Sequence, residues 1–130
     1  MNYTLIFFLA IAVLIVIYFG QIYLSKFKLI GETNPLQSDS PESIKTWQVY
    51  YFHSPHCGAC KKTTPVVNDH HERHEQVTSI DISSDLETAQ KFNIKATPTT
   101  VFLENNVVTN VELGSSSLQS INDFINKHEP

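Results

Sequence analysis

The hydrophobic positions of this chain fall into two patterns. Residues 5–19 form an unbroken apolar run, and residues 20–24 extend it to a stretch of twenty positions. A helix of that length spans about 30 Å, the thickness of a bilayer's hydrocarbon core. From about residue 44 onward, shorter apolar segments alternate with polar and turn-forming residues. The first pattern predicts a transmembrane helix, and the second predicts a small globular domain.

The globular part contains alternating strand and helix patterns. Residues 46–52 are rich in aromatic and β-branched side chains, which predicts a buried strand. The pattern then predicts a helix over 60–75 and a strand over 76–83. A capping box at 84–87 opens a short helix that ends near residue 92. Two further strands are predicted over 99–103 and 107–113, joined by a turn at 105–106, and a last helix follows the serines at 115–117. This βαβαββα order predicts an α/β fold, a four-stranded mixed sheet with helices on both faces, preceded by one transmembrane helix.

A linker separates the two parts of the chain. Residues 31–43 contain two prolines, three serines and no strong apolar periodicity. We therefore divide the chain into an anchor with its flank (1–30), a linker (31–43) and a domain (44–130). The domain carries seven Lys or Arg and ten Asp or Glu residues, which leaves no electrostatic footprint for nucleic acid. We expect this domain to be monomeric.

The apolar run is interpreted as a retained anchor rather than a cleaved signal peptide. No lysine or arginine precedes it, and no small-residue cleavage site follows it. Lys26 and Lys28 come directly after the span, so the positive-inside rule favours a cytoplasmic domain. Two lysines are a small bias, and the extracytoplasmic side stays open. We expect a single-pass protein of the cell membrane, inserted through residues 5–24.

Both cysteines of the chain lie in the segment HSPHCGAC at 53–60. Two thiols at C-x-x-C spacing can close and reopen a small disulfide ring. A helix that begins there favours the thiolate through its free N–H groups and its dipole. These are the requirements of thiol–disulfide exchange. A structural zinc ribbon needs a second cysteine pair, which the chain lacks.

The complete pattern resembles the thioredoxin family in its minimal form, over about residues 47–128. The matching features are the CGAC motif at 57–60, Lys61, Pro65, the Thr-Pro-Thr at 97–99 and Gly114. The resemblance implies that Cys57 is the attacking thiolate and Cys60 the resolving thiol. It also implies that Pro98 is a cis-proline, which lets the backbone of Thr97 pair with an extended substrate strand.

The site departs from the family pattern at several positions. The family often buries an acid six residues before the first cysteine as a proton relay, and this chain has Tyr51 there. Ala59 replaces the usual proline between the cysteines. Water, His53 or His56 could substitute for the missing acid. A protonated His56 would also favour the neighbouring thiolate, although an exposed loop histidine without a role fits the sequence equally well.

These features predict a membrane-tethered thiol–disulfide oxidoreductase with no cofactor and no metal. Its expected partners are protein thiols or disulfides and an unidentified redox donor. One alternative is a non-catalytic thioredoxin-like adaptor. Another is a metal-binding module or metallochaperone that uses His53, His56, Cys57 and Cys60. Ligands so close in sequence rarely close a tetrahedron together. The histidines within 70–74 are surrounded by charged residues, which favours a solvated helix face.

Overall fold

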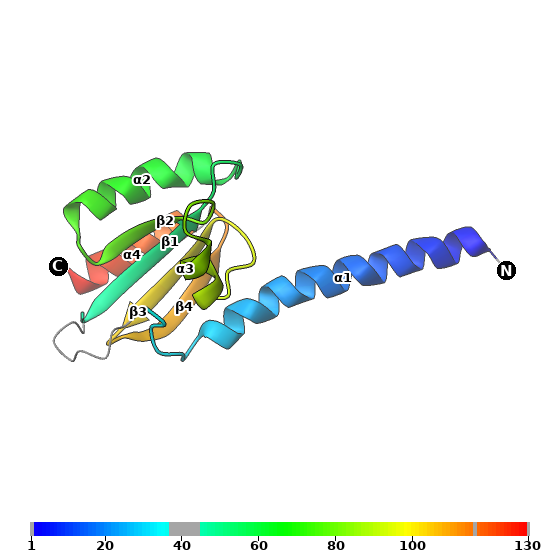
Figure 1. Cartoon of the computed structure of the whole chain (residues 1–130), viewed down its shortest axis with the longest axis horizontal. Helices are drawn as coiled ribbons and strands as arrows, with labels where there is room; N and C mark the ends of the chain where they lie inside the picture. Colours follow the sequence, from blue (N-terminus) through cyan, green and yellow to red (C-terminus); the bar gives the residue numbers. More distant parts are fainter. Residues whose placement is uncertain (1, 37–44, 116, 130) are drawn as a thin grey trace.

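The computed structural model describes residues 2–36, 45–115 and 117–129, and it shows a long helix leading into an α/β domain (Figure 1). The elements in chain order are α1 (Tyr3–Leu29), β1 (Trp47–His53), α2 (Cys60–Arg73), β2 (Val77–Asp81), α3 (Leu86–Lys91), β3 (Thr99–Glu104), β4 (Val107–Leu113) and α4 (Ser117–His128). The predicted βαβαββα order is confirmed.

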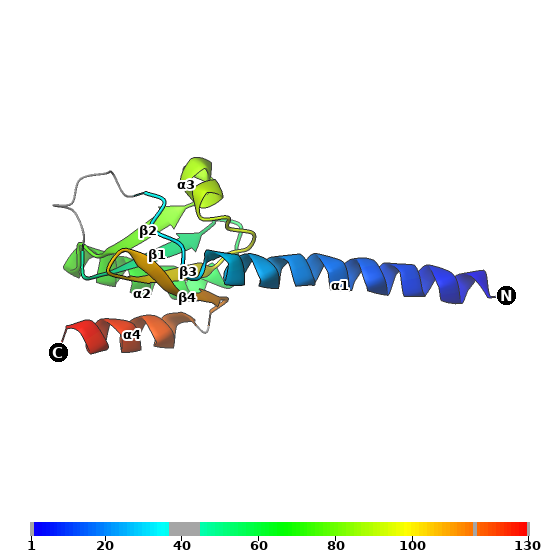
Figure 2. The same ribbon diagram turned by 90° about the horizontal axis from the view of Figure 1, so that it is seen from below.

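The four strands form one mixed sheet in the order β2-β1-β3-β4. The first two strands are parallel and joined through α2, whereas β3 is antiparallel to both β1 and β4. Viewed edge-on, the sheet has α3 on one side and α4 on the other (Figure 2). The expected thioredoxin-like α/β architecture is therefore present.

Alternate residues of β1 supply two separate hydrophobic layers. Val49 and Tyr51 pack with α2 and α4, while Tyr50 and Phe52 pack on the opposite face with α3 and the end of α1. Successive side chains of a strand point to opposite faces, so a central strand covered on both sides must be apolar throughout. This explains the aromatic run of β1. Packing on both faces also holds β1 in place, and the cysteine motif follows the end of this strand.

The turn between β2 and α3 differs from its prediction. The carboxylate of Asp81 accepts hydrogen bonds from the backbone N–H and the hydroxyl of Ser83, at 2.9 and 2.6 Å. This local turn ends the strand two residues earlier than expected. The hydroxyl of Ser84 is used in the same turn, donating to the Asp81 carbonyl. Asp85 caps the helix instead, accepting from the N–H of Thr88 at 3.2 Å.

The long helix α1 extends away from the domain, and its side chains are exposed until Leu29 enters the core at 7% exposure. By length and composition it can cross a membrane, a test that a signal sequence also meets. The chain then runs beside the outer edge of β4. Val108 accepts a hydrogen bond from the N–H of Gly31 at 2.8 Å and donates one to the carbonyl of Glu32 at 2.9 Å. The expected linker thus begins in contact with the sheet, and its positions 37–43 lie outside the described residues.

Candidate active site

The two cysteines are joined by a disulfide at the start of α2, with their Cα atoms 5.3 Å apart. Cys57 is partly exposed, whereas Cys60 is 2% exposed. The backbone N–H of Cys60 donates to Cys57 Sγ at 3.2 Å. A helix N-terminal N–H group therefore points at the outer sulfur, which stabilises negative charge there. Cys57 is thus the more exposed residue of the pair, which fits the attacking role that the resemblance implies for it.

A tight turn delivers the motif from the sheet to the helix. β1 ends at His53, and the N–H of Cys57 bonds back to the Ser54 carbonyl at 3.2 Å. Ala59 occupies the N-cap position without a side-chain cap. Because no side chain caps the first turn, its N–H groups stay available to the sulfur of Cys57.

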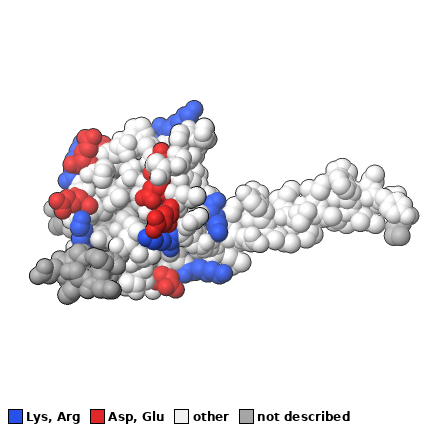
Figure 3. Space-filling view, in the orientation of Figure 1, with Lys and Arg blue, Asp and Glu red and all other residues white. Residues whose placement is uncertain are grey.

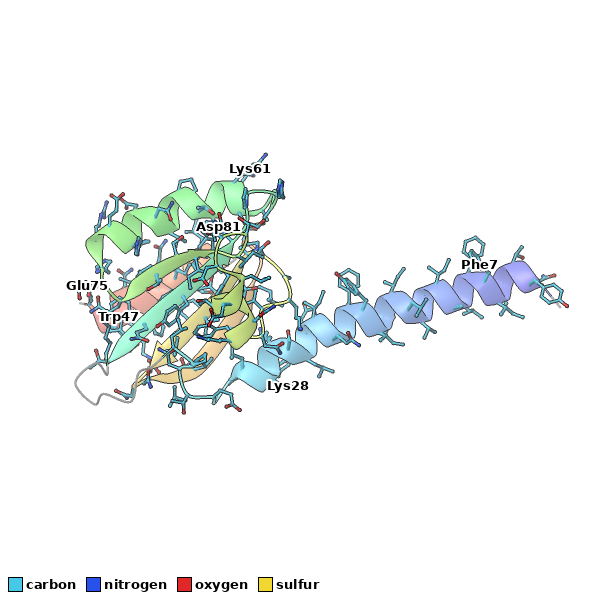
Figure 4. All side chains as sticks on the ribbon, in the orientation of Figure 1. Phe7, Lys28, Trp47, Lys61, Glu75 and Asp81 are labelled. Carbon is cyan, nitrogen blue, oxygen red and sulfur yellow. A yellow bond between two sulfur atoms is a disulfide. The ribbon has the colours of Figure 1, made fainter. Side chains whose placement is uncertain are left out.

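The cysteines open into a surface groove of about 380 Å³. Its walls come from the end of β1, the turn and the first half of α2: His53, Ser54, Pro55, Cys57, Cys60, Lys61, Thr64, Pro65 and Asn68. Figure 4 shows Lys61 at this end of the domain and Glu75 at the opposite end. The groove gives a partner's sulfur access to Cys57 across an open surface.

His53 is the histidine that lines this groove. The sequence offered it as one of three substitutes for the family's buried acid, together with water and His56. Its ring stacks on that of Tyr51 at 5.6 Å between centroids, and it lies opposite Asp81 in the β1–β2 register. Burial lowers the pKa of His53, and the nearby Asp81 carboxylate partly opposes this effect. The imidazole is therefore mainly neutral at neutral pH, which makes it a proton acceptor.

Tyr51, at the position of the family's buried acid, is fully buried. Its hydroxyl hydrogen bonds to the hydroxyl of Thr64 at 3.1 Å. Burial raises the pKa of Tyr51, and the hydrogen bond only partly offsets this. The phenol therefore stays protonated near neutral pH and cannot accept the proton that the family's carboxylate would take.

The Thr97–Pro98 peptide bond is cis, as predicted. Thr99 pairs with Phe52, directly before the last residue of β1, so Pro98 lies at the same end of the sheet as the cysteine motif. The Pro98 carbonyl accepts from the N–H of Gly114 at 2.9 Å, which joins the residue before β3 to the residue after β4. These contacts place the Thr97 backbone at the end of the sheet where a substrate would bind.

His56 is exposed, and its backbone N–H bonds to the Ser54 hydroxyl at 3.4 Å. It is not among the residues that line the groove. Within residues 2–36, 45–115 and 117–129, no group of three His, Cys, Asp or Glu residues is placed to hold a metal ion. The metal-binding alternative therefore gains no support from the geometry.

Of the three histidines within 70–74, His71 is exposed as the sequence predicts, whereas His70 and His74 are half-buried and contact α4 or the residue after it. His70 Nε2 lies 2.7 Å from the side-chain oxygen of Asn122, and His74 Nδ1 lies 2.8 Å from the Glu129 carboxylate. Their partners belong to α4 and the residue after it. These side chains therefore join two helices that cover the same face of the sheet, and their role is structural.

Comparison with known proteins agrees with this geometry. The family model for Thioredoxin matches residues 40–127. The chain is 27% identical to a thioredoxin of Bacillus subtilis over 95 residues, covering 71% of this chain and 91% of that protein. A thioredoxin of Haemophilus influenzae is 23% identical over 100 residues, 75% of this chain and 88% of the relative.

Solved structures give the same result. A thioredoxin pre-protein of Schistosoma mansoni superposes with a TM-score of 0.54 at 28% identity, covering 66% of this chain and 82% of that one. A thioredoxin of Nicotiana alata gives a TM-score of 0.56 at 25% identity, covering 68% and 78%. The family match spans more than half of the chain and includes the paired cysteines at the start of α2. The chain therefore belongs to the thioredoxin family and is a thiol–disulfide oxidoreductase.

Proposed function

We propose that this protein is held in the cell membrane by α1 and exchanges disulfides with protein partners through Cys57 and Cys60. The observation that carries the proposal is the Cys60 N–H directed at Cys57 Sγ, 3.2 Å away, at the end of the sheet that also holds cis-Pro98. An exposed sulfur with this support is the nucleophile of the pair, and the buried one resolves the intermediate.

The exchange proceeds in two steps that conserve sulfur bonds. The Cys57 thiolate attacks one sulfur of a partner disulfide, forms a mixed disulfide and releases the partner's other sulfur as a thiolate. The Cys60 thiol then loses its proton and attacks Cys57 Sγ, which releases the partner's second thiolate. Two electrons pass to the partner, and the Cys57–Cys60 disulfide remains. Oxidation of a partner dithiol runs through the same steps in reverse.

His53 takes the proton of Cys60 in this scheme. Both residues line the same groove, and burial lowers the pKa of His53, which keeps the imidazole neutral. Tyr51 cannot take the proton, since burial raises its pKa.

Thr97 and Pro98 are proposed to bind the partner chain. The cis bond precedes β3, and Thr99 already pairs with Phe52. A partner segment in extended conformation can add hydrogen bonds to the backbone of Thr97. His56 is proposed only as a modest electrostatic contributor, because its exposed position leaves it well screened.

The contact between anchor and domain supports retention of α1. The helix continues without a break to Leu29, whose side chain is buried in the core on the α3 side of the sheet. The following residues are hydrogen bonded to Val108 of β4. Signal peptidase requires an accessible segment of small residues, which this packed helix end does not offer. We keep the cytoplasmic orientation as a proposal based on Lys26 and Lys28.

Single cysteine variants test the assigned roles. Cys57→Ser should abolish disulfide exchange, because no exposed thiolate remains. Cys60→Ser should instead accumulate mixed disulfides with partners, because the resolving thiol is missing. Non-reducing gels of the purified full-length variants, with a model protein disulfide as substrate, measure both outcomes. Trapping by both variants to the same extent would contradict the division of roles, and exchange by the double serine variant would contradict the site itself.

A further inference from the structure

We propose that the active-site groove faces the membrane surface and that its partner is a cysteine pair of an integral membrane protein, located at the lipid–water boundary. The inference deepens the proposed function and rests on it, because it needs both the tether and the exchange centre. The argument uses the position of the groove relative to α1, the level at which α1 leaves the bilayer, and the charges at that junction.

The groove and the anchor lie at the same end of the domain. Figures 1 and 2 show α1 leading away from the end of the sheet at which β1 ends and α2 begins. The contacts agree with the views: a hollow is lined by residues of the last two turns of α1 and by 93–96 of the loop before β3. That loop continues directly into cis-Pro98. The same short segment thus lines the hollow beside the anchor and leads into Thr97 and Pro98, the proposed substrate-binding residues.

The contact begins where the apolar run ends. The run reaches Leu24, and the α1 residues that line the hollow are Ile22, Ser25, Lys26 and Leu29. Eight residues of helix from Ile22 to Leu29 rise only about 11 Å. The loop at 93–96 is therefore held within about that distance of the hydrocarbon boundary, and no stalk separates the domain from the membrane. A partner that reaches far above the membrane would meet the opposite end of the domain.

Charges at this junction fit contact with phosphate headgroups. Lys26 and Lys28 occupy the last turn of α1, and Lys95 belongs to the adjoining loop. Figure 3 shows basic side chains where α1 meets the domain. A second hollow beside the end of α1 is lined by Lys28, Glu32 and Lys91, so the acidic residue there is accompanied by two lysines. Anionic lipid headgroups attract such lysines, which holds the same end of the domain against the membrane.

A groove in this position selects its partner by location. The partner's sulfurs must reach Cys57 from the membrane side, which suits cysteines in a short loop or at the end of a transmembrane helix. Two proteins confined to one membrane also meet at a high effective concentration, so exchange gains rate without any additional contact. The chemistry is the exchange written above, with both partner sulfurs supplied by the membrane protein.

The first experiment measures the orientation of the domain. The full-length protein, with Cys57→Ser and Cys60→Ser, receives one fluorophore through either Lys61→Cys or Glu75→Cys. Both positions are exposed and lie near the two ends of α2 (Figure 4). The fourteen residues of α2 place the labels about 20 Å apart along the helix. In nanodiscs of phosphatidylcholine and phosphatidylglycerol with headgroup-quenching lipids, we expect at least threefold stronger quenching at position 61. Equal quenching, or stronger quenching at 75, overturns the proposal.

The second experiment measures partner preference with the reduced wild-type protein in the same nanodiscs. One synthetic single-span peptide carries a disulfide at the lipid boundary, and a matched peptide carries it on a rigid spacer of about 30 Å, far beyond the height of the helix–domain contact. We expect at least tenfold faster reduction of the boundary disulfide. Equal rates, or preference for the raised disulfide, overturn the membrane-facing groove. A small water-soluble disulfide serves as the control: if it is not reduced either, the proposed oxidoreductase function fails instead.

Discussion

At the residue scale, the site differs from the family pattern in where a proton can go when Cys60 reacts. The family's buried acid is replaced by Tyr51, whose phenol stays protonated because burial raises its pKa. The stacked neighbour His53 reaches the groove instead, and burial lowers its pKa. In the proposed scheme the proton acceptor therefore lies at the end of β1, two residues after the position of the family's buried acid.

His53→Asn should slow the release of partners from the mixed disulfide by about tenfold or more at pH 7, since general-base assistance typically contributes at least that much. Burial lowers the pKa of His53 below the ordinary 6.5. The wild-type rate should therefore fall as the pH drops below this lowered pKa and the imidazole becomes protonated. The variant should lack this fall. Stopped-flow measurement of the resolving step, from pH 5 to 8, checks both points.

His56→Asn is the matched control, because His56 is exposed and does not line the groove. It should keep the wild-type rate and the wild-type pH profile of the resolving step. If His56→Asn slows that step as much as His53→Asn does, the proton acceptor has been assigned to the wrong histidine.

At the element scale, one carboxylate of the sheet attaches the last helix to it. The Glu104 carboxylate on β3 accepts from Lys127 at 3.0 Å and lies 2.7 Å from His128 Nε2, both on α4. These partners lower the pKa of Glu104. A carboxylate with a folded-state pKa below its unfolded value stabilises the protein above the unfolded value and loses this effect as the pH falls through the folded one.

Glu104→Gln should therefore destabilise the domain at pH 7 but hardly at pH 3. The loss should be about 0.5–1 kcal/mol, because the side chain is partly exposed and the pairs are screened by solvent. Thermal unfolding of the variant and the wild type at both pH values measures it. Glu87→Gln is the control, since Glu87 pairs with Lys91 at 3.0 Å on the surface and is 79% exposed. A larger loss at pH 3 than at pH 7 would disprove the electrostatic attachment of α4.

Much of this architecture follows from local patterns in the sequence. The β1 run and the C-x-x-C spacing predicted the strand and the start of α2, and the resemblance to the thioredoxin family implied the cis Thr97–Pro98 bond. The prediction for the turn at 81–85 was wrong, because the Ser84 hydroxyl donates to the Asp81 carbonyl and the helix is capped by Asp85 instead. The place of His53 in the groove depends on packing between β1, β2 and α2, which no local pattern reports.

At the scale of the whole molecule, the anchor and the domain share a boundary rather than a free linker. Leu29 is buried among side chains of the sheet and α3. Residues 31–34 then follow the outer edge of β4, where Thr33 bridges Val107 and the N–H of Asn34 bonds to the Asn106 carbonyl at 2.9 Å. This pairing could not be predicted, because it joins positions more than seventy residues apart. It also covers part of a sheet edge that would otherwise be open to association.

The boundary gives a prediction for soluble forms of the protein. Chains of residues 25–130 and 37–130 both lack the apolar run and should both be soluble and redox-active. The longer chain should unfold at a temperature higher by roughly 8 °C or more, because it keeps Leu29 in the core and the 31–34 pairing on β4. Burial of one leucine contributes about 2 kcal/mol, and a domain of this size shifts by about 4–8 °C per kcal/mol.

Leu29→Ala in the longer chain separates the side chain from the backbone pairing. This variant should lose about 2–3 kcal/mol relative to residues 25–130, since a buried leucine is replaced by a cavity. It should nevertheless stay monomeric, because 31–34 still covers the edge of β4. The 37–130 chain exposes that edge and should associate at high concentration.

Light scattering and thermal unfolding of the three chains check these outcomes. Identical unfolding temperatures for all three would show that the end of α1 adds nothing to the domain, and the short distance between groove and bilayer would then lose its structural basis.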